Sequence, residues 1–164
     1  MSSIADRLRQ ARDQLFVGRE DEVEHFRSLL ARDPLPANVL HVFGPGGVGK
    51  TSLLQVFERV CEEEGVTAAS VDARDVEPTP EAFRRALRYA VGTDADEPVL
   101  SALTERGDRA VLLVDTYETV EALDGWLREE FLPGLPEHVL LVLAGRNEPS
   151  AEWRTDPGWQ ALVD

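Results

Sequence analysis

The segment from Gly44 to Thr51 places the tightest constraint on how this chain can fold. It matches the pattern G-x-x-x-x-G-K-[ST] at every fixed position. The apolar run at residues 39–43 precedes it and favours a buried strand, whereas residues 52–57 behind it have the apolar spacing of a helix. The sequence therefore predicts a glycine-rich turn that joins the end of a strand to the N-terminus of a helix.

This turn has the composition that phosphate binding requires. Backbone N–H groups that wrap around a phosphate need conformations that glycine adopts at low cost, and the main chain comes too close for a Cβ atom. The N-terminus of the following helix adds unpaired N–H groups and a positive dipole end. The residues expected to contact the phosphates of a nucleotide are Gly44, Pro45, Gly46, Gly47, Val48, Gly49, Lys50, Thr51 and Ser52.

Two side chains of the motif have individual roles in this chemistry. Lys50 is expected to reach the β- and γ-phosphates of ATP, and the Thr51 hydroxyl is expected to ligate Mg²⁺. Lys50 is also the only lysine among the 17 lysine and arginine residues of the chain, so its placement here by chance is improbable. The alternative, a glycine-rich turn that binds nothing, is disfavoured by the flanking strand and helix patterns.

Asp115 is the second chemical landmark. The residues at 110–114 are all apolar and lead directly into this aspartate, which is typical of a central parallel strand buried on both faces. The carboxylate would emerge at the C-terminal edge of the sheet beside the phosphate loop, where it can hold Mg²⁺ directly or through water. We therefore expect Thr51 and Asp115 to form a metal site; the alternative for Asp115 is a simple capping role.

The order of the remaining patterns predicts the fold class. Helical patterns occur at 4–15, 23–30, 52–60, 80–91, 98–106 and 120–131, and strand patterns at 39–43, 66–71, 110–115 and 139–144. The last fourteen residues show no convincing period. Because strands alternate with helices throughout, we expect an α/β fold with a parallel sheet and right-handed crossovers.

Composition excludes several other classes of protein. The 164 residues are 43% hydrophobic and 29% charged, and no apolar run approaches the length of a membrane span. The N-terminus lacks the apolar core of a signal peptide, and Cys61 stands alone, so we expect a cytoplasmic protein with no internal disulfide. The net charge of −14 repels phosphate backbones, so no nucleic-acid partner is predicted.

Several motifs in order resemble the nucleotide-binding domain of AAA+ and STAND-class ATPases, including Orc/Cdc6-like and LuxR-associated members. Besides the phosphate loop and the strand before Asp115, they are the Phe-Val-Gly-Arg-Glu box at 16–20, residues 132–136, and the strand that leads to Arg146. This resemblance implies a three-layer P-loop ATPase fold with helices on both faces of the sheet, and ATP with Mg²⁺ as ligands. It also implies that Val17 and Arg19 line the adenine side and that Arg146 contacts the γ-phosphate as a sensor.

The resemblance also suggests how the chain is organised. Residues 1–18 are expected to form an N-terminal helix and the adenine-side lead-in, and residues 19–164 the ATPase core. In the family a fifth strand and a helical lid follow, and neither is expected before Asp164. Since that strand flanks the first one, the phosphate-loop strand should lie at an exposed edge. Further domains, subunits or protein partners are therefore expected.

One departure from the family bears on catalysis. Many AAA+ enzymes have a glutamate directly after the metal aspartate, where this chain has Thr116. Glu118 can serve instead as the base that activates water, or it can simply favour the start of a helix. The predicted function is thus an ATP-binding, slowly hydrolysing switch; the alternative is a non-catalytic nucleotide-binding interaction module or a truncated fragment. A GTPase is disfavoured, because the only lysine is in the phosphate loop and an N-K-x-D box is absent.

Overall fold

The strands of the computed structural model form one parallel sheet. The structure describes residues 3–5, 20–43, 50–92, 108–147 and 149–155. Within these ranges the sheet has the order β1-β4-β3-β2, and every neighbouring pair is parallel. Its strands are β1 (Val39–Phe43), β2 (Thr67–Asp72), β3 (Ala110–Asp115) and β4 (Val139–Gly145). The predicted parallel α/β class is confirmed, and β1 lies at one edge of the described sheet, as the resemblance implies.

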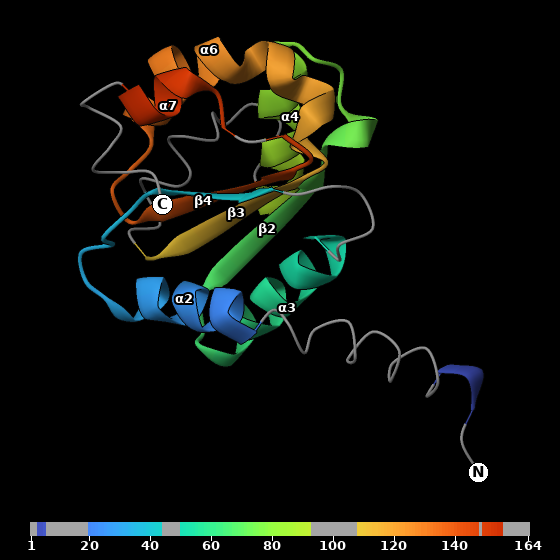
Figure 1. Cartoon of the computed structure of the whole chain (residues 1–164), viewed down its shortest axis with the longest axis vertical. Coiled ribbons are helices and arrows are strands. Elements are labelled where there is room, and N and C mark those ends of the chain that lie inside the picture. The colour runs from blue at the N-terminus through green and yellow to red at the C-terminus, as the bar shows by residue number, and fades with distance from the viewer. Residues whose placement is uncertain (1–2, 6–19, 44–49, 93–107, 148, 156–164) are drawn as a thin grey trace.

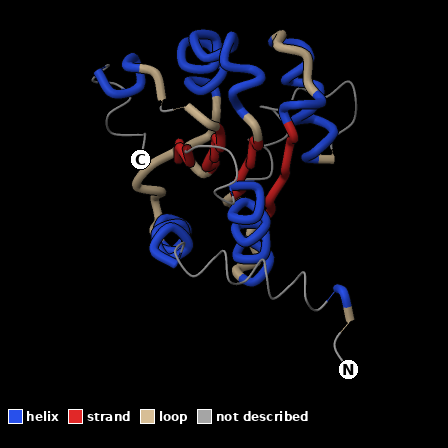
Figure 2. Tube along the Cα trace, turned by 45° about the vertical axis from the view of Figure 1, so that its right-hand side comes forward, coloured by secondary structure: helices blue, strands red, loops and turns tan. Residues whose placement is uncertain are grey.

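Helices cover both faces of this sheet and so form the predicted three layers. On one face lie α2 (Glu20–Ala31) and α3 (Lys50–Glu63). On the other face lie α4 (Pro80–Val91), the helical segment 117–134 and α7 (Ala151–Thr155), as Figure 1 shows. The turned view in Figure 2 shows the same separation, with the strands between the two sets of helices. None of the described helices has the length and apolar character needed to cross a membrane.

The pleat of the strands divides the core into two clusters. On β3, Val111 and Leu113 join the cluster formed with α2 and α3, whereas Leu112 and Val114 join the cluster formed with α4. Because both faces are covered, every residue of β4 is buried. This double coverage explains why these strands read as uninterrupted apolar runs in the sequence.

The helix boundaries follow their local chemistry. The Thr79 side chain accepts a hydrogen bond from the backbone N–H of Ala82 at 3.2 Å and caps α4, with Pro80 in the first turn. Gly92 ends this helix with a φ of 81°, and Gly65 follows α3 with a φ of 70°. Both angles lie in the left-handed region that glycine adopts most easily, so the predicted helix ends are confirmed.

The prediction of one regular helix over 120–131 is wrong. The structure has four short pieces here: η2 (Tyr117–Leu123, 3-10), α6 (Asp124–Trp126), η3 (Leu127–Phe131, π) and η4 (Leu132–Gly134, 3-10). Val120 has a non-helical φ of −121° at the main kink. The apolar residues at 120, 123, 127 and 131 are nevertheless all buried, so the changes of pitch keep the predicted apolar face on the sheet.

The structure adds a helix where no period was visible. The five residues of α7 are too few to show periodicity, but Trp153 within it is fully buried. Its ring meets His41 of β1 edge-on, with ring centroids 4.9 Å apart. One aromatic side chain thus anchors this helix beside the edge strand. The helices predicted over 4–15 and 98–106 lie almost entirely outside the described residues.

Candidate functional site

The described residues of the predicted site lie at or near the carboxyl ends of the parallel strands. Helix α3 begins at Lys50, so Lys50 and Thr51 form its first turn, a few residues after the end of β1. Ser52 follows on the same helix and is half-buried. Asp115 is the last residue of β3. The other predicted nucleotide contacts, Val17, Arg19 and the loop residues 44–49, lie outside the described residues and stay predictions.

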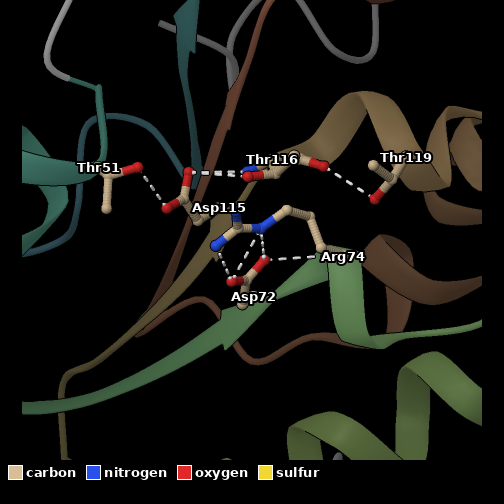
Figure 3. Close-up of polar contacts among 6 residues, drawn as sticks. All are labelled: Thr51, Asp72, Arg74, Asp115, Thr116 and Thr119. Carbon is tan, nitrogen blue, oxygen red and sulfur yellow. Dashed lines mark hydrogen bonds and ion pairs between the residues drawn. The ribbon is translucent and has the colours of Figure 1, made fainter. Parts of the chain in front are cut away.

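Thr51 and Asp115 are in direct contact across 64 positions of the sequence (Figure 3). The Thr51 hydroxyl donates to Oδ2 of Asp115 at 2.8 Å, and the backbone N–H of Thr116 donates to Oδ1 at 2.8 Å. A hydroxyl and a carboxylate are hard oxygen donors of the kind that Mg²⁺ prefers, usually completed by phosphates and water. In the described part of the chain, no group of three or more His, Cys, Asp or Glu side chains could hold a metal by itself. The pair therefore fits a magnesium ion that arrives with phosphate.

Thr116, directly after the metal-site aspartate, has an unusual backbone. Its φ of 58° and ψ of 44° lie in the left-handed region, which is rare for a residue branched at Cβ. The backbone N–H and the hydroxyl of Thr119 both donate to the Thr116 carbonyl, at 3.1 Å and 3.0 Å. Strain of this kind is concentrated at functional sites in proteins. The strained backbone of Thr116 therefore indicates that the surrounding structure fixes the conformation of the chain at the end of β3.

Glu118 and Arg146, predicted independently, are brought together. The backbone N–H of Arg146 donates to Oε2 of Glu118 at 3.3 Å, and its Nε lies 3.6 Å from Oε1. The Arg146 side chain is 67% exposed, whereas that of Glu118 is only 20% exposed. Gly145 permits this approach, because a Cβ there would lie 3.1 Å from Oε2 of Glu118. The candidate base and the candidate sensor thus form one ion pair at the end of β4.

A second ion pair next to Asp115 was not predicted from the sequence. The Nε and Nη2 atoms of Arg74 donate to Oδ1 and Oδ2 of Asp72 at 3.0 and 2.7 Å. Asp72 ends β2 and pairs in register with Asp115 of β3. The hydrogen bond from Arg74 holds the pKa of Asp72 below its ordinary value and the pKa of Arg74 above its own. The only sequence signal was an Asp-x-Arg triplet after a strand, which is a common turn pattern.

A third polar cluster surrounds Asp124 on the opposite face of the sheet from α3. Its carboxylate accepts hydrogen bonds from the Tyr117 hydroxyl at 2.7 Å, the Trp153 indole at 2.8 Å and the Ser150 hydroxyl at 2.8 Å. The Arg128 Nε lies 3.5 Å away. A hollow of about 230 Å³ between this cluster and the ends of β1 and β4 is smaller than most ligand pockets. The cluster is therefore best understood as a structural anchor.

The parallel sheet is covered by helices on both faces, and the Thr51 hydroxyl at the start of α3 contacts the Asp115 carboxylate at the carboxyl edge of the sheet. This arrangement defines a P-loop NTPase fold. A comparison with protein families matches residues 15–152 to the AAA ATPase domain. The chain belongs to this family. A comparison with curated protein sequences found no match.

Solved structures show the same fold. A chain of Drosophila ORC bound to DNA has a TM-score of 0.65 and 18% identity, over 94% of this chain and 43% of its own. The ORC1 protein of Aeropyrum pernix in complex with DNA gives 0.63 and 22%, over 88% and 44%. Cdc6p from Pyrobaculum aerophilum gives 0.61 and 16%, over 90% and 45%. The present chain thus spans less than half of each of these relatives.

Proposed function

We propose that this chain is an ATP-binding nucleotide switch module of a STAND- or AAA-type regulatory protein. The observation that carries the proposal is the 2.8 Å contact between the Thr51 hydroxyl and Asp115. It joins the first turn of the phosphate helix to the end of the central strand, where a magnesium ion bound to nucleotide phosphates would need its protein oxygens. Membership of the AAA ATPase family supports the same ligand.

Each residue of the site has a role in this proposal. Lys50 binds the β- and γ-phosphates at the N-terminus of α3, while Thr51 and Asp115 hold the metal. When bound, Mg²⁺ neutralises charge that develops on the phosphate oxygens. Val17 and Arg19 contact the adenine side. Binding of ATP then biases contacts with further domains, subunits or protein partners.

The Glu118–Arg146 pair suggests how hydrolysis would be controlled. A γ-phosphate attracts the Arg146 guanidinium, which suits bidentate contact with phosphate oxygens. Movement of the exposed Arg146 side chain toward it would weaken the contact with Glu118 and leave this carboxylate able to accept a proton from water. The same arginine would therefore report the γ-phosphate and release the base.

A non-catalytic binding module is the second candidate. It is favoured by Thr116 at the position where related enzymes carry a glutamate, and by the engagement of Glu118 with Arg146. Both candidates bind ATP, but only the switch hydrolyses it. Phosphate release that is lost in Glu118→Gln supports the switch, whereas ATP binding without release in the wild-type chain supports the module.

The binding experiment is calorimetric titration of the purified chain with Mg·ATP. We expect micromolar affinity that falls by about a hundredfold in Lys50→Ala, since a charged hydrogen bond to phosphate is lost in a partly dry site. Arg59→Ala on an exposed turn of the same helix is the matched control and should bind like the wild type. A folded wild-type chain that binds no ATP would overturn the proposal.

The expected partners also rest on this proposal. The net charge of −14 argues against nucleic acid as a ligand of this chain, although two of the relatives above were solved with DNA. The exclusion of nucleic acid therefore stays a prediction, as does the cytoplasmic location. The STAND-type signalling role rests on the sequence motifs alone.

A further inference from the structure

Arg74 is held in a defined position at the carboxyl edge of the sheet. Two of its guanidinium nitrogens and its backbone N–H all donate to the Asp72 carboxylate, at 2.7 to 3.1 Å. Asp72 also caps the short helix η1 (Ala73–Asp75) that carries the arginine. A guanidinium group bound through two nitrogens to one carboxylate has little rotational freedom. The guanidinium is therefore preorganised, although the Arg74 side chain is 67% exposed.

The position of this guanidinium links it to the candidate nucleotide site. Figure 3 shows it between the side chains of Asp72 and Asp115; the raised pKa of Arg74 comes mainly from its contact with Asp72, with a smaller contribution from the charge of Asp115. Asp115 is the residue that Thr51 contacts. Within the described residues, the Nη1 atom of Arg74 makes no hydrogen bond or ion pair. Among the described residues, one nitrogen of this oriented cation thus has no acceptor beside the proposed metal carboxylate.

Stability alone is a weak reason for this arrangement. An exposed ion pair contributes little to folding, because water screens the charges and the side chains lose entropy. Binding of a magnesium ion at Asp115 would also place two positive charges near Arg74. The carboxylates of Asp72 and Asp115 offset part of this repulsion, and further anionic oxygens that contact both cations would offset the rest. The terminal phosphate of a nucleoside triphosphate supplies oxygens of this kind.

We propose that Arg74, positioned by Asp72, contacts the terminal phosphate of a nucleoside triphosphate and makes the site prefer triphosphate to diphosphate. This inference rests on the proposed nucleotide site and deepens it. Arg74 would act from the β2 side of Asp115, whereas Lys50 acts from α3 and Arg146 from the end of β4. Asp72 would be a positioning residue, because it holds the arginine and does not itself touch the nucleotide.

The test compares Mg·ATP and Mg·ADP affinities by calorimetry in variants of this pair. We expect Arg74→Gln to weaken ATP binding about tenfold, as for one charge-assisted hydrogen bond, while ADP affinity stays within about twofold. Asp72→Asn should weaken ATP binding less and in the same selective way, and Asp72→Glu should recover part of the loss. Arg85→Gln removes another exposed arginine, from α4, and should leave both affinities unchanged.

The outcomes separate this inference from the proposed function. Equal losses for ATP and ADP, or no loss in Arg74→Gln, would overturn the role of Arg74 while the nucleotide site stands. Tighter ATP binding in that variant would also overturn it, because Arg74 would then be only a counter-ion that competes with Mg²⁺ for Asp115. Absence of nucleotide binding by the folded wild-type chain would overturn both. Thermal unfolding of each variant without nucleotide, close to that of the wild type, confirms that the variants are folded.

Discussion

At the scale of single residues, Thr116 combines a side chain branched at Cβ with a left-handed backbone, so its Cβ atom carries a cost in stability. The Cβ atom of an L-residue in this region lies too close to the following carbonyl, which costs about 1–2 kcal/mol. The structure maintains it through the backbone N–H bond to Asp115 and the two bonds that Thr119 donates. Because Thr116 follows Asp115 directly, the turn fixes where the metal-site carboxylate points.

Two substitutions at this residue isolate the backbone cost. Thr116→Ala and Thr116→Gly both remove the hydroxyl, but only alanine keeps the Cβ atom. We expect the glycine variant to be about 1 kcal/mol more stable than the alanine variant, after allowance for the greater freedom of glycine in the unfolded chain. Urea unfolding of the two proteins measures this difference. If alanine proves equal or better, the left-handed turn does not exist in solution.

At the scale of elements, Asp124 connects two segments that are far apart in the sequence, 117–124 and 150–153. It accepts hydrogen bonds from Tyr117 of η2, Trp153 of α7 and Ser150, which lies just before α7. Burial raises the pKa of Asp124, but these hydrogen bonds outweigh it, so the pKa lies below the ordinary value of 3.8. A single carboxylate therefore attaches the short α7 helix to the rest of the fold.

This attachment predicts a defined pH dependence. We expect Asp124→Asn to lower the free energy of unfolding at neutral pH by about 2 kcal/mol, as hydrogen bonds to a charged group are weakened. Because the folded-state pKa is depressed, this contribution is fully present above the ordinary value of 3.8 and is lost as the pH falls through the lower folded-state value. Denaturant unfolding of both proteins across this range should show the difference shrinking in acid.

An exposed acid on the same segment provides the control for this pH series. Glu129→Gln changes a carboxylate on η3 that is open to solvent. Its unfolding curve should follow that of the wild type at every pH. A difference between wild type and Asp124→Asn that stays constant through acid would contradict the lowered pKa.

The strands were predictable because their pattern reflects burial on both faces. The expected bounds of β1 and β3 agree with the structure, and those of β2 and β4 differ by a single residue at their ends. The segment 117–134 was less predictable, since its apolar spacing suits one helix while the backbone changes pitch three times. The α7 helix depends on Trp153 meeting distant partners, which local periodicity does not reveal.

The candidate site likewise has contacts that the sequence predicted and contacts that it did not. Thr51 and Asp115 were predicted to share a metal site because parallel strands bring their carboxyl ends to one edge; the structure places the two side chains in contact, and their role as metal ligands stays a prediction. The pairing of Glu118 with Arg146 depends on the close packing of η2 against Gly145, a contact between distant segments. Arg74 was missed because its importance comes from the strand register of β2 with β3 and not from any motif.

At the scale of the whole molecule, the proposed ligand would bridge the two halves of the core. Thr51 belongs to α3, which packs on one face, and Asp115 ends a strand that contributes to both apolar clusters. A ligand held by both residues would bind the folded chain and not the unfolded one. Its binding energy would then add to the stability of the entire fold.

This linkage gives a measurable expectation. Mg·ATP at a hundred times its dissociation constant should raise the free energy of unfolding by about 2.7 kcal/mol. Urea unfolding with and without nucleotide measures the shift, and Lys50→Ala should show almost none. A shift of equal size in that variant would mean that nucleotide binds elsewhere on the chain.

Lys50 carries the only side-chain amine in the sequence, and it stands at the first residue of α3 with part of its surface exposed. Any reagent or enzyme that modifies lysine amines, by acylation, alkylation or conjugation, therefore has a single side-chain target in these 164 residues. In most proteins such chemistry spreads over a surface and leaves the function intact. Here it would fall on the residue proposed to hold the phosphates, so lysine modification and nucleotide occupancy would exclude each other.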